Sequence, residues 1–285
     1  MAKQRKKQHK ALRRLLLLLA VVLGALYWAN TSIQTERFTF ASAALPDGFD
    51  GYRAVVLTDL HGASFGKNNE KLIDAVAEQA PDAIFLVGDL VDENTQDAAD
   101  YAASFGAALA GIAPTYYGTG NHEWACGTEE PERIKTALTD SGVTVLSNEF
   151  CELSRGGDAI VIAGVDDPNG YADQKTPEAL RSEVQSARGD CFSILLSHRD
   201  SVEYYDELGF SLTLCGHGHG GIFRIPLVDR GLFGTNHRFF PTYDGGLYEL
   251  EGGKACFVSR GLGNIGASLR IFNRPQVAVI TLERG

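Results

Sequence analysis

The sequence predicts an α/β protein in which stacked, mixed β-sheets are flanked by helices, after one N-terminal transmembrane helix. From about residue 51, short apolar runs alternate with helical patterns, and beyond residue 221 Gly-rich turns separate further short strands. Strand–helix units followed by a strand-rich tail are typical of sheets covered by helices. With 285 residues, of which 44% are hydrophobic and 22% charged, the chain can bury a proper core.

The N-terminal segment predicts a membrane anchor. Residues 1–14 form a basic tail with seven positive charges and no acid, and residues 15–29 are an unbroken apolar run. A spanning helix needs about 20 residues, so this run is short. Arg13 and Arg14 can extend to the headgroups, however, and Tyr27 and Trp28 fall where an interfacial aromatic belt lies. We therefore expect an anchor over residues 15–33 in the cell membrane, with the basic tail in the cytoplasm and the rest outside.

Two alternatives to the anchor stay open, a cleaved signal peptide and a soluble protein. The sequence 41–43, Ala-Ser-Ala, is a weak cleavage site, and the Arg pair before the Leu run resembles a twin-arginine export signal. Residues 34–50 are expected to be a linker, and residues 51–285 a single catalytic domain.

The charge distribution disfavours nucleic acid as a partner. Beyond the tail, 19 basic residues face 36 acidic ones, and a surface this acidic repels polyanions. Metal ions could reverse the potential locally. The five cysteines form no CxxC pair and suggest buried thiols rather than a disulfide framework, although a bond between Cys126 and Cys151 stays open.

The expected elements follow from these apolar patterns. Strands are expected at residues 53–58, 83–87, 115–119, 143–146, 159–165, 192–196, 212–215, 246–251, 255–259 and 277–282, and helices at 69–79, 97–109, 131–141 and 177–188.

Metal-binding residue types follow five of these strands. They are Asp59 and His61, Asp89, Asn121 with His122, His198, and His217 with His219. In sheets of this kind, ligands gather beyond the carboxyl ends of the strands. Asp59 and His61 are two residues apart, as are His217 and His219, so in extended backbone each pair points to one side. We expect all of these side chains to share one pocket.

The composition of this set predicts two metal ions. Carboxylate, imidazole and amide ligands suit Mn, Fe, Zn or Co better than Ca, and their number is about twice what one ion requires. Paired ions roughly 3.5–4 Å apart form the clamp used for in-line attack on phosphorus.

The ordered set of motifs resembles the calcineurin-like metallophosphoesterases over roughly residues 50–285. The resemblance implies an αββα sandwich and a first metal held by Asp59, His61, Asp89 and His219. It implies a second metal held by Asp89, Asn121, His198 and His217, with Asp89 and a hydroxide as bridges. It also implies that His122 stabilises or protonates the leaving oxygen, and that Asp92 orients the motif histidine.

A narrower resemblance concerns membrane-anchored bacterial members, including enzymes similar to UDP-2,3-diacylglucosamine pyrophosphatases. The segments 164–168, 218–221, 259–263 and 269–271 carry it. The expected activity is hydrolysis of phosphoester or pyrophosphate bonds in a lipid-linked or cell-envelope substrate. The alternatives are a nucleotide or protein phosphatase of the same chemistry and an inactive metal-binding scaffold.

Some residues near these motifs have two interpretations. Arg260 and Arg270 could clamp a phosphate or form structural ion pairs. Glu123 is expected to support a ligand or cap a helix, and His237 to lie in a loop. Asp166 and Asp167 are expected in a turn.

Overall fold

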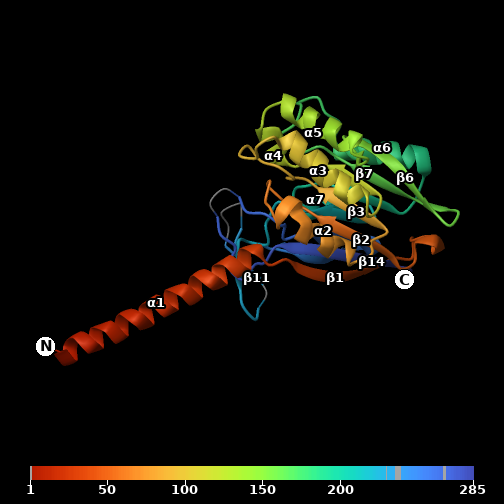
Figure 1. Ribbon diagram of the computed structural model, residues 1–285. Helices are drawn as coiled ribbons and strands as arrows, with labels where there is room; N and C mark the ends of the chain where they lie inside the picture. The colour runs from red at the N-terminus through yellow and green to blue at the C-terminus, as the bar shows by residue number, and fades with distance from the viewer. Residues whose placement is uncertain (1, 229, 235–238, 266–267) are drawn as a thin grey trace.

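Two six-stranded sheets stack face to face, and helices cover the outer face of each sheet (Figure 1). The computed structural model describes residues 2–228, 230–234, 239–265 and 268–285. The predicted fold class, stacked mixed sheets flanked by helices, is confirmed.

The first sheet has the strand order β1-β14-β2-β3-β4-β5. Its strands are β1 (Gln34–Ala41), β14 (Gln276–Glu283), β2 (Tyr52–Leu57), β3 (Ala83–Val87), β4 (Thr115–Gly118) and β5 (Thr144–Val145). The run from β2 to β5 is parallel, whereas β14 is antiparallel to β2 and parallel to β1. The parallel run aligns the carboxyl ends of β2, β3 and β4 at one edge, which is where their polar residues follow.

The second sheet has the order β12-β13-β9-β8-β7-β6. Its strands are β12 (Gly246–Leu250), β13 (Lys254–Val258), β9 (Leu212–Cys215), β8 (Ser193–Leu196), β7 (Asp158–Gly164) and β6 (Glu149–Arg155). The central strands β13, β9, β8 and β7 are parallel. The strand-rich tail thus divides, since β12 and β13 extend the second sheet and β14 enters the first.

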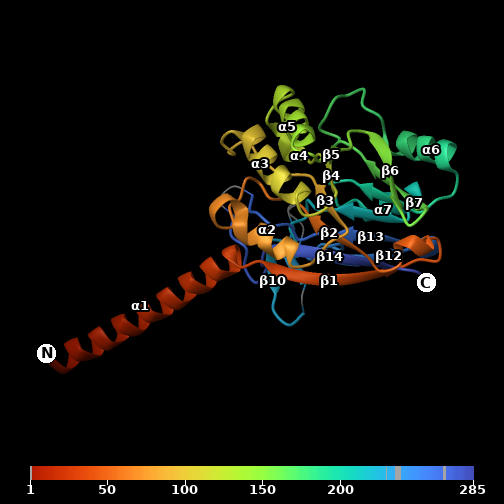
Figure 2. The ribbon, with the colours of Figure 1, turned by 45° about the vertical axis from the view of Figure 1, so that its right-hand side comes forward.

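Three apolar layers hold the sandwich together (Figure 2). Side chains from both sheets, among them Phe85 and Phe257, interleave between the sheets. Strand residues alternate faces, so the other side of each strand packs against helices. The helices α2 (Glu70–Ala77), α3 (Ala98–Ala110) and α5 (Glu129–Asp140) cover the first sheet, and α6 (Pro177–Arg188) and α7 (Val202–Leu208) cover the second.

Several short elements were not predicted from the sequence. They are α4 (Asn121–Ala125), α7, strand β6, the hairpin β10 (Phe223–Ile225) and β11 (Arg230–Phe233), and the 3-10 turns at Asp47–Phe49, Lys67–Asn69 and Glu251–Gly253. The two missed helices span about two turns or less, too few to show a clear helical period. Strand β6 lies at a sheet edge and carries only partly buried side chains.

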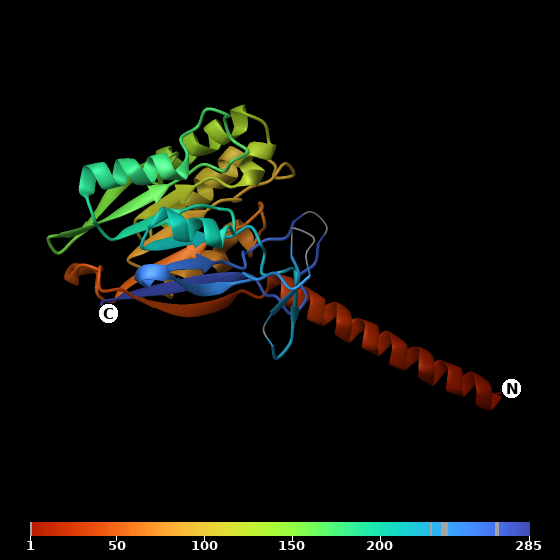
Figure 3. The same ribbon diagram turned by 180° about the vertical axis from the view of Figure 1, so that it is seen from behind.

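The helix α1 (Ala2–Thr31) extends away from the sandwich, as Figure 3 shows from behind. Residues Arg5–Thr31 are long and apolar enough to cross a membrane, and an N-terminal signal sequence meets the same criterion. The expectation of a linker after the helix is wrong for residues 34–41, because β1 pairs in register along β14. Alternating side chains of β1 pack on the core, which includes Phe40. The chain therefore passes from α1 into the sheet after two residues.

All five cysteines are free thiols, so the open possibility of a Cys126–Cys151 disulfide is not realised. Cys215 and Cys256 are buried, with their sulfur atoms 3.7 Å apart. His237, expected in a loop, lies outside the described residues.

Candidate metal centre

Loops after five parallel strands converge at one end of the sandwich. They follow β2, β3, β4, β8 and β9, and α4, which begins at Asn121, lies at the end of the domain from which α1 extends (Figure 1). Asp59, Asp89, His198, His61 and His219 are all buried. The structure therefore brings the predicted residues together, and three groups of their ligand atoms lie within 4.8 Å of one another.

One group contains Asp59, His61 and His219. The Nε2 atoms of His61 and His219 are 3.1 Å apart, and His219 Nε2 lies 3.2 Å from Asp59 Oδ1. Asp89 adjoins this group, because its Oδ2 is 3.8 Å from His61 Nε2. These are the four residues expected around a first metal.

A second group contains Asp89, His198 and His217. His198 Nε2 lies 2.9 Å from Asp89 Oδ2, and its Nδ1 lies 2.9 Å from the carbonyl oxygen of Val87. An N–H···O=C contact of this kind fixes the tautomer and leaves Nε2 available as a ligand. Asp89 thus lies between both groups, as a bridging carboxylate must.

The backbone at these positions is strained rather than extended. Asp59, His61, Asp89, His217 and His219 have φ between 47° and 67°, in the left-handed region. The expectation that extended backbone would align the paired residues is therefore wrong, although the pairs do converge. Non-glycine residues in this region are uncommon and cost free energy, and they concentrate at functional sites.

Glycines allow the loops to approach each other. A Cβ atom on Gly120 would collide with Oδ1 and the backbone nitrogen of Asp89, and one on Gly216 would collide with the carboxylate of Asp59. The Gly before Asn121 and the Gly before His217 are therefore steric requirements of the site.

Glu123 organises the two central loops. Its carboxylate accepts hydrogen bonds from the backbone N–H groups of Asp89, Leu90 and Gly120, at 3.0, 2.6 and 2.8 Å. The side chain is fully buried. Burial and the nearby Asp89 raise the pKa of Glu123 to about 7, whereas the N–H groups of Gly120 and Leu90 favour its charged form. Glu123 thus ties the loop that carries Asp89 to the loop that carries Asn121.

The ion pair of Asp89 and His198 dominates the electrostatics of the site. Burial alone would raise the pKa of Asp89, but His198 outweighs it and lowers that pKa to about 2. Burial would lower the pKa of His198, but Asp89 outweighs it and raises that pKa to about 10. Asp89 and His198 thus each favour the charged form of the other.

His122 lies at the edge of the site. Its backbone N–H donates to Asp89 Oδ1 at 2.8 Å, its ring packs edge-on against His61, and its Nδ1 lies 3.3 Å from Glu93 Oε2. Asp92, expected to orient a histidine, instead bonds to Thr95 Oγ1 and to the backbone N–H of Asn94. The acidic partner of the His122 ring is therefore Glu93, which the motif comparison did not single out.

The contacts of Arg270 and Arg260 favour a structural role over a phosphate clamp for both residues. Arg270 is buried and donates to the carbonyl oxygens of Gly263 and Arg260, and its Nη2 lies 3.3 Å from His219 Nδ1. Burial lowers the pKa of Arg270 to about 10. Arg260 pairs with Glu36 on β1. Arg270 thus positions the His219 ring from behind.

We expect Arg270→Lys to weaken metal binding by about tenfold, because residues behind metal-binding histidines typically contribute 10–100-fold to affinity. Lys keeps the charge but lacks the planar fork that meets two carbonyl oxygens and His219 together. Calorimetric titration with Mn²⁺ measures this, with Arg133→Lys on the exposed face of α5 as the control. Equal affinities in both variants would contradict the positioning role.

Arg199 was missed in the sequence analysis, although it directly follows His198. Its guanidinium forms a bidentate pair with Asp167, and its Nη1 lies 3.1 Å from His217 Nε2. The side chain is partly exposed, so the positive charge of Arg199 faces solvent beside the second group of candidate ligands. Asp166, expected in a turn with Asp167, is buried and binds Thr119 and Lys135. These two acids therefore anchor the strand ends around the site.

The donor set fits divalent metal ions. Oδ1 of Asn121 is buried and has no hydrogen-bond partner among the described residues. The facing Nε2 atoms of His61 and His219, 3.1 Å apart, cannot both carry protons, and a shared cation would satisfy both. Two carboxylates, one amide and four imidazoles match borderline ions such as Mn, Fe, Co or Zn.

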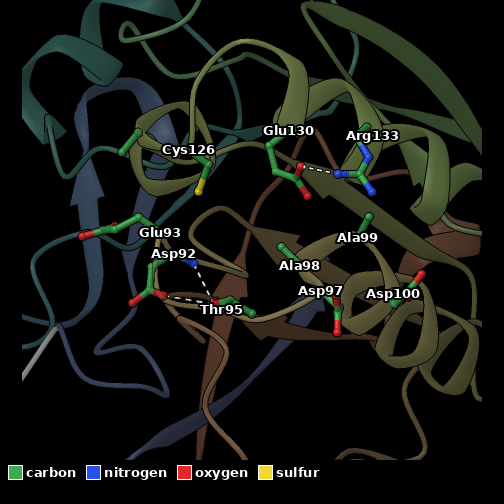
Figure 4. A pocket seen from close by; sticks show the side chains of 11 residues that line it. Asp92, Glu93, Thr95, Asp97, Ala98, Ala99, Asp100, Cys126, Glu130 and Arg133 are labelled. Atoms are coloured by element: carbon green, nitrogen blue, oxygen red, sulfur yellow. Dashed lines mark hydrogen bonds and ion pairs between the residues drawn. The ribbon is translucent and has the colours of Figure 1, made fainter.

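Two hollows adjoin the site. The larger, about 710 Å³, is lined by His61, Asp92 and Tyr101 and reaches Asn264. The other, about 460 Å³, lies between α3, α4 and α5 and has acidic walls (Figure 4). In that view, Asp92 is joined to Thr95, and Glu93 points away from them. Only the first hollow touches a metal-ligand candidate.

Residues 52–221 match the family described as calcineurin-like phosphoesterase, and the chain belongs to that family. Fold, donor set and family together define a dimetal phosphoesterase.

Similar proteins of known sequence are also described as phosphoesterases. An uncharacterized metallophosphoesterase of Campylobacter jejuni is 31% identical, over 98% of this chain and 73% of its own length. Phosphodiesterase YaeI of Escherichia coli is 32% identical, over 84% of this chain and 85% of its own. Among solved structures, the NAD nucleotidase NadN of Haemophilus influenzae has a TM-score of 0.52 at 16% identity, over 74% of this chain and 46% of that one. The chain thus spans about half of that structure, a likeness that concerns the fold alone.

Proposed function

We propose that this protein is a membrane-anchored phosphodiesterase whose catalytic domain lies outside the cytoplasm and whose substrate is a lipid-linked or cell-envelope diester or pyrophosphate. The observation that carries the proposal is the position of the site. The candidate ligand His219 lies next to Arg270, and the backbone N–H of Arg270 donates to Asn30 near the end of α1. This helix has the length and composition of a membrane span. The basic tail favours a cytoplasmic N-terminus.

The hollow beside His61 supports a substrate at the bilayer. One of its walls is Asn264, whose side-chain amide donates to Asn30 Oδ1 near the end of α1 at 3.1 Å. A molecule in this hollow would therefore extend from the metal ligands toward the base of the anchor. Such a path suits a substrate whose apolar part stays in the membrane.

The roles proposed for the residues follow from their contacts. Asp59, His61, Asp89 and His219 would hold one divalent ion, and Asp89, Asn121, His198 and His217 the other. The ions would supply Lewis acidity and lower the pKa of a bound water molecule. His122 would give a proton to the leaving oxygen, with its ring oriented by Glu93. Arg199, held by Asp167, would pair with a non-bridging phosphate oxygen.

His122→Ala is expected to lower kcat about 100-fold without loss of metal, because general acid–base groups typically contribute 10²–10⁴-fold. The ring also lies in a group with His61 and Asp89, so a ligand role needs to be tested directly. Elemental analysis of the purified variant distinguishes the two roles. A protein that has lost half of its metal would show that His122 is a ligand and would contradict the acid role.

The activity is tested with the full chain in detergent, loaded with Mn²⁺, on a chromogenic phosphodiester and on the corresponding monoester. We expect faster cleavage of the diester and complete loss with a chelator. Metal-loaded protein that cleaves neither would overturn the proposal and favour a metal-binding scaffold.

The substrate class is tested separately. A lipid diester and a lipid pyrophosphate in mixed micelles are compared with a dinucleotide of the same bond type. The narrower resemblance to UDP-2,3-diacylglucosamine pyrophosphatases predicts a preference for the pyrophosphate, whereas the likeness to phosphodiesterase YaeI favours the diester. Faster cleavage of the dinucleotide would refute a lipid-linked substrate.

A further inference from the structure

Large apolar side chains are exposed beside the base of α1. Among the described residues outside that helix, eight such side chains are exposed, and all except Tyr171 come from the segments 223–240 and 269–272. We call these seven the apolar patch: Phe223, Leu227, Val228, Phe239, Phe240, Leu269 and Phe272. Soluble surfaces rarely gather apolar residues in this way unless they bind something.

A hydrogen bond and a series of β-bridges connect the patch segments to the anchor. Asn30, near the end of α1, accepts from the backbone N–H of Arg270, between Leu269 and Ile271. Ile271 bridges to Phe223 on β10, and Phe223 pairs with Phe233 on β11. Phe233 in turn bridges to Phe239. All three ribbon views place this hairpin region beside the domain end of α1 (Figures 1–3).

Hydrogen bonds and a cation–π contact fix the end of α1 to the domain. Arg274 donates to the carbonyl oxygens of Ser32 and Ile33, and its guanidinium lies 4.6 Å from the centre of the Trp28 ring. With β1 starting at Gln34, a flexible spacer is replaced by paired strand. When α1 is inserted in the bilayer, this joint between helix and domain therefore holds the patch at a fixed distance from the bilayer surface.

Three patch residues are held in unfavourable backbone conformations. Leu227, Phe240 and Phe272 have φ of 72°, 53° and 52°. Bulky residues rarely occupy this region, and here their exposed side chains gain little packing in return. Strain of this kind points to a function outside the domain core.

The length of the apolar run in α1 also favours contact between the patch and a lipid bilayer. Residues 15–29 span about 22 Å as a helix, less than the roughly 30 Å of a hydrocarbon core. A short span is accommodated by thinning the bilayer or by bringing flanking groups into it. Leu269 and Phe272, next to the anchor, are positioned to enter the interface.

We infer that the apolar patch inserts into the outer surface of the same bilayer that α1 crosses, and so holds the metal site against the membrane. This inference rests on the proposed anchor. Arg270, between the two patch residues Leu269 and Phe272, contacts both Asn30 and His219. Docking therefore brings the candidate metal centre within one side chain of the lipid surface, and the enzyme takes its substrate from the membrane plane.

Tryptophan quenching in nanodiscs tests the insertion. Full-length Phe240→Trp and Phe272→Trp are placed in phosphatidylcholine nanodiscs with brominated or ordinary acyl chains. Each added Trp is expected to lose about half or more of its emission in the brominated discs, because interfacial side chains lie roughly 5–10 Å into the headgroup–acyl boundary. Ala187→Trp, on exposed helix α6 away from the patch, is the matched control and should keep its emission.

The controls separate docking from anchoring. Comparing the unsubstituted protein with Trp28→Phe shows whether Trp28, near the end of α1, is quenched. If Trp28 is quenched while both added Trp residues behave like Ala187→Trp, the anchor stands and the docking is refuted. If Trp28 is not quenched, both are refuted. Unchanged diesterase activity in detergent verifies that each variant is folded. A variant that fails this check is replaced by Leu227→Trp, because Leu227 is fully exposed in the turn between β10 and β11.

Discussion

Asp89→Asn is expected to reduce metal-dependent phosphodiester hydrolysis by about 10³-fold. Asp89 is buried between both groups of candidate ligands, and its Oδ2 lies 2.9 Å from His198 and 3.8 Å from His61. Asn keeps the shape, and its Oδ1 can still accept from His122, but it removes the negative charge shared by both sites. A loss of about 4 kcal/mol in transition-state stabilisation corresponds to a factor of 10³, within the range that metal clamps supply.

The measurement combines kinetics with metal content. The diesterase rate of Asp89→Asn is compared with that of Asp74→Asn, which changes an exposed carboxylate on α2. We expect the control to match the unsubstituted protein, and Asp89→Asn to retain at most one ion per chain. A variant with two ions and a rate within tenfold of normal would exclude Asp89 as the bridge.

Glu123→Gln is expected to lower the free energy of unfolding by about 3 kcal/mol and the melting midpoint by roughly 10 °C. The Glu123 carboxylate accepts from three buried N–H groups in two loops. Gln offers one oxygen instead of two, and its amide N–H₂ would face a backbone N–H, which leaves a buried donor unsatisfied. Asp89 would also move, so we expect diesterase activity to fall with stability.

Thermal unfolding with and without Mn²⁺ tests this, with Glu78→Gln at the exposed end of α2 as the control. Burial and the nearby Asp89 raise the pKa of the folded Glu123 carboxyl to about 7. Between about pH 7 and the ordinary pKa of a glutamate, the folded protein therefore holds a proton that the unfolded chain has released, and the unsubstituted protein gains stability as the pH falls. Because Gln does not titrate, the difference in stability between the unsubstituted protein and Glu123→Gln should grow as the pH falls from about 7 to 5. A constant difference from pH 5 to pH 9 would contradict the raised pKa of Glu123.

Much of the centre was predictable because each candidate ligand follows a strand of apolar residues. Buried parallel strands give continuous apolar runs, and a polar residue at the end of one is conspicuous. Asp59, Asp89, Asn121, His198 and His217 could all be found in this way. The glycines beside them were equally visible, since the close approach of Gly120 to Asp89 needs a residue without a side chain.

The sequence by itself determined the class of fold, the metal-binding residue types and the apolar N-terminal helix, because these depend on local pattern and chain order. Only the tertiary structure decided that β1 replaces a linker, that Glu93 rather than Asp92 meets His122, and that Arg199 flanks His217. Each of these joins segments far apart in sequence or depends on side-chain direction. The apolar patch is of the same kind: its phenylalanines resemble core residues in the sequence, and only packing leaves them exposed beside α1.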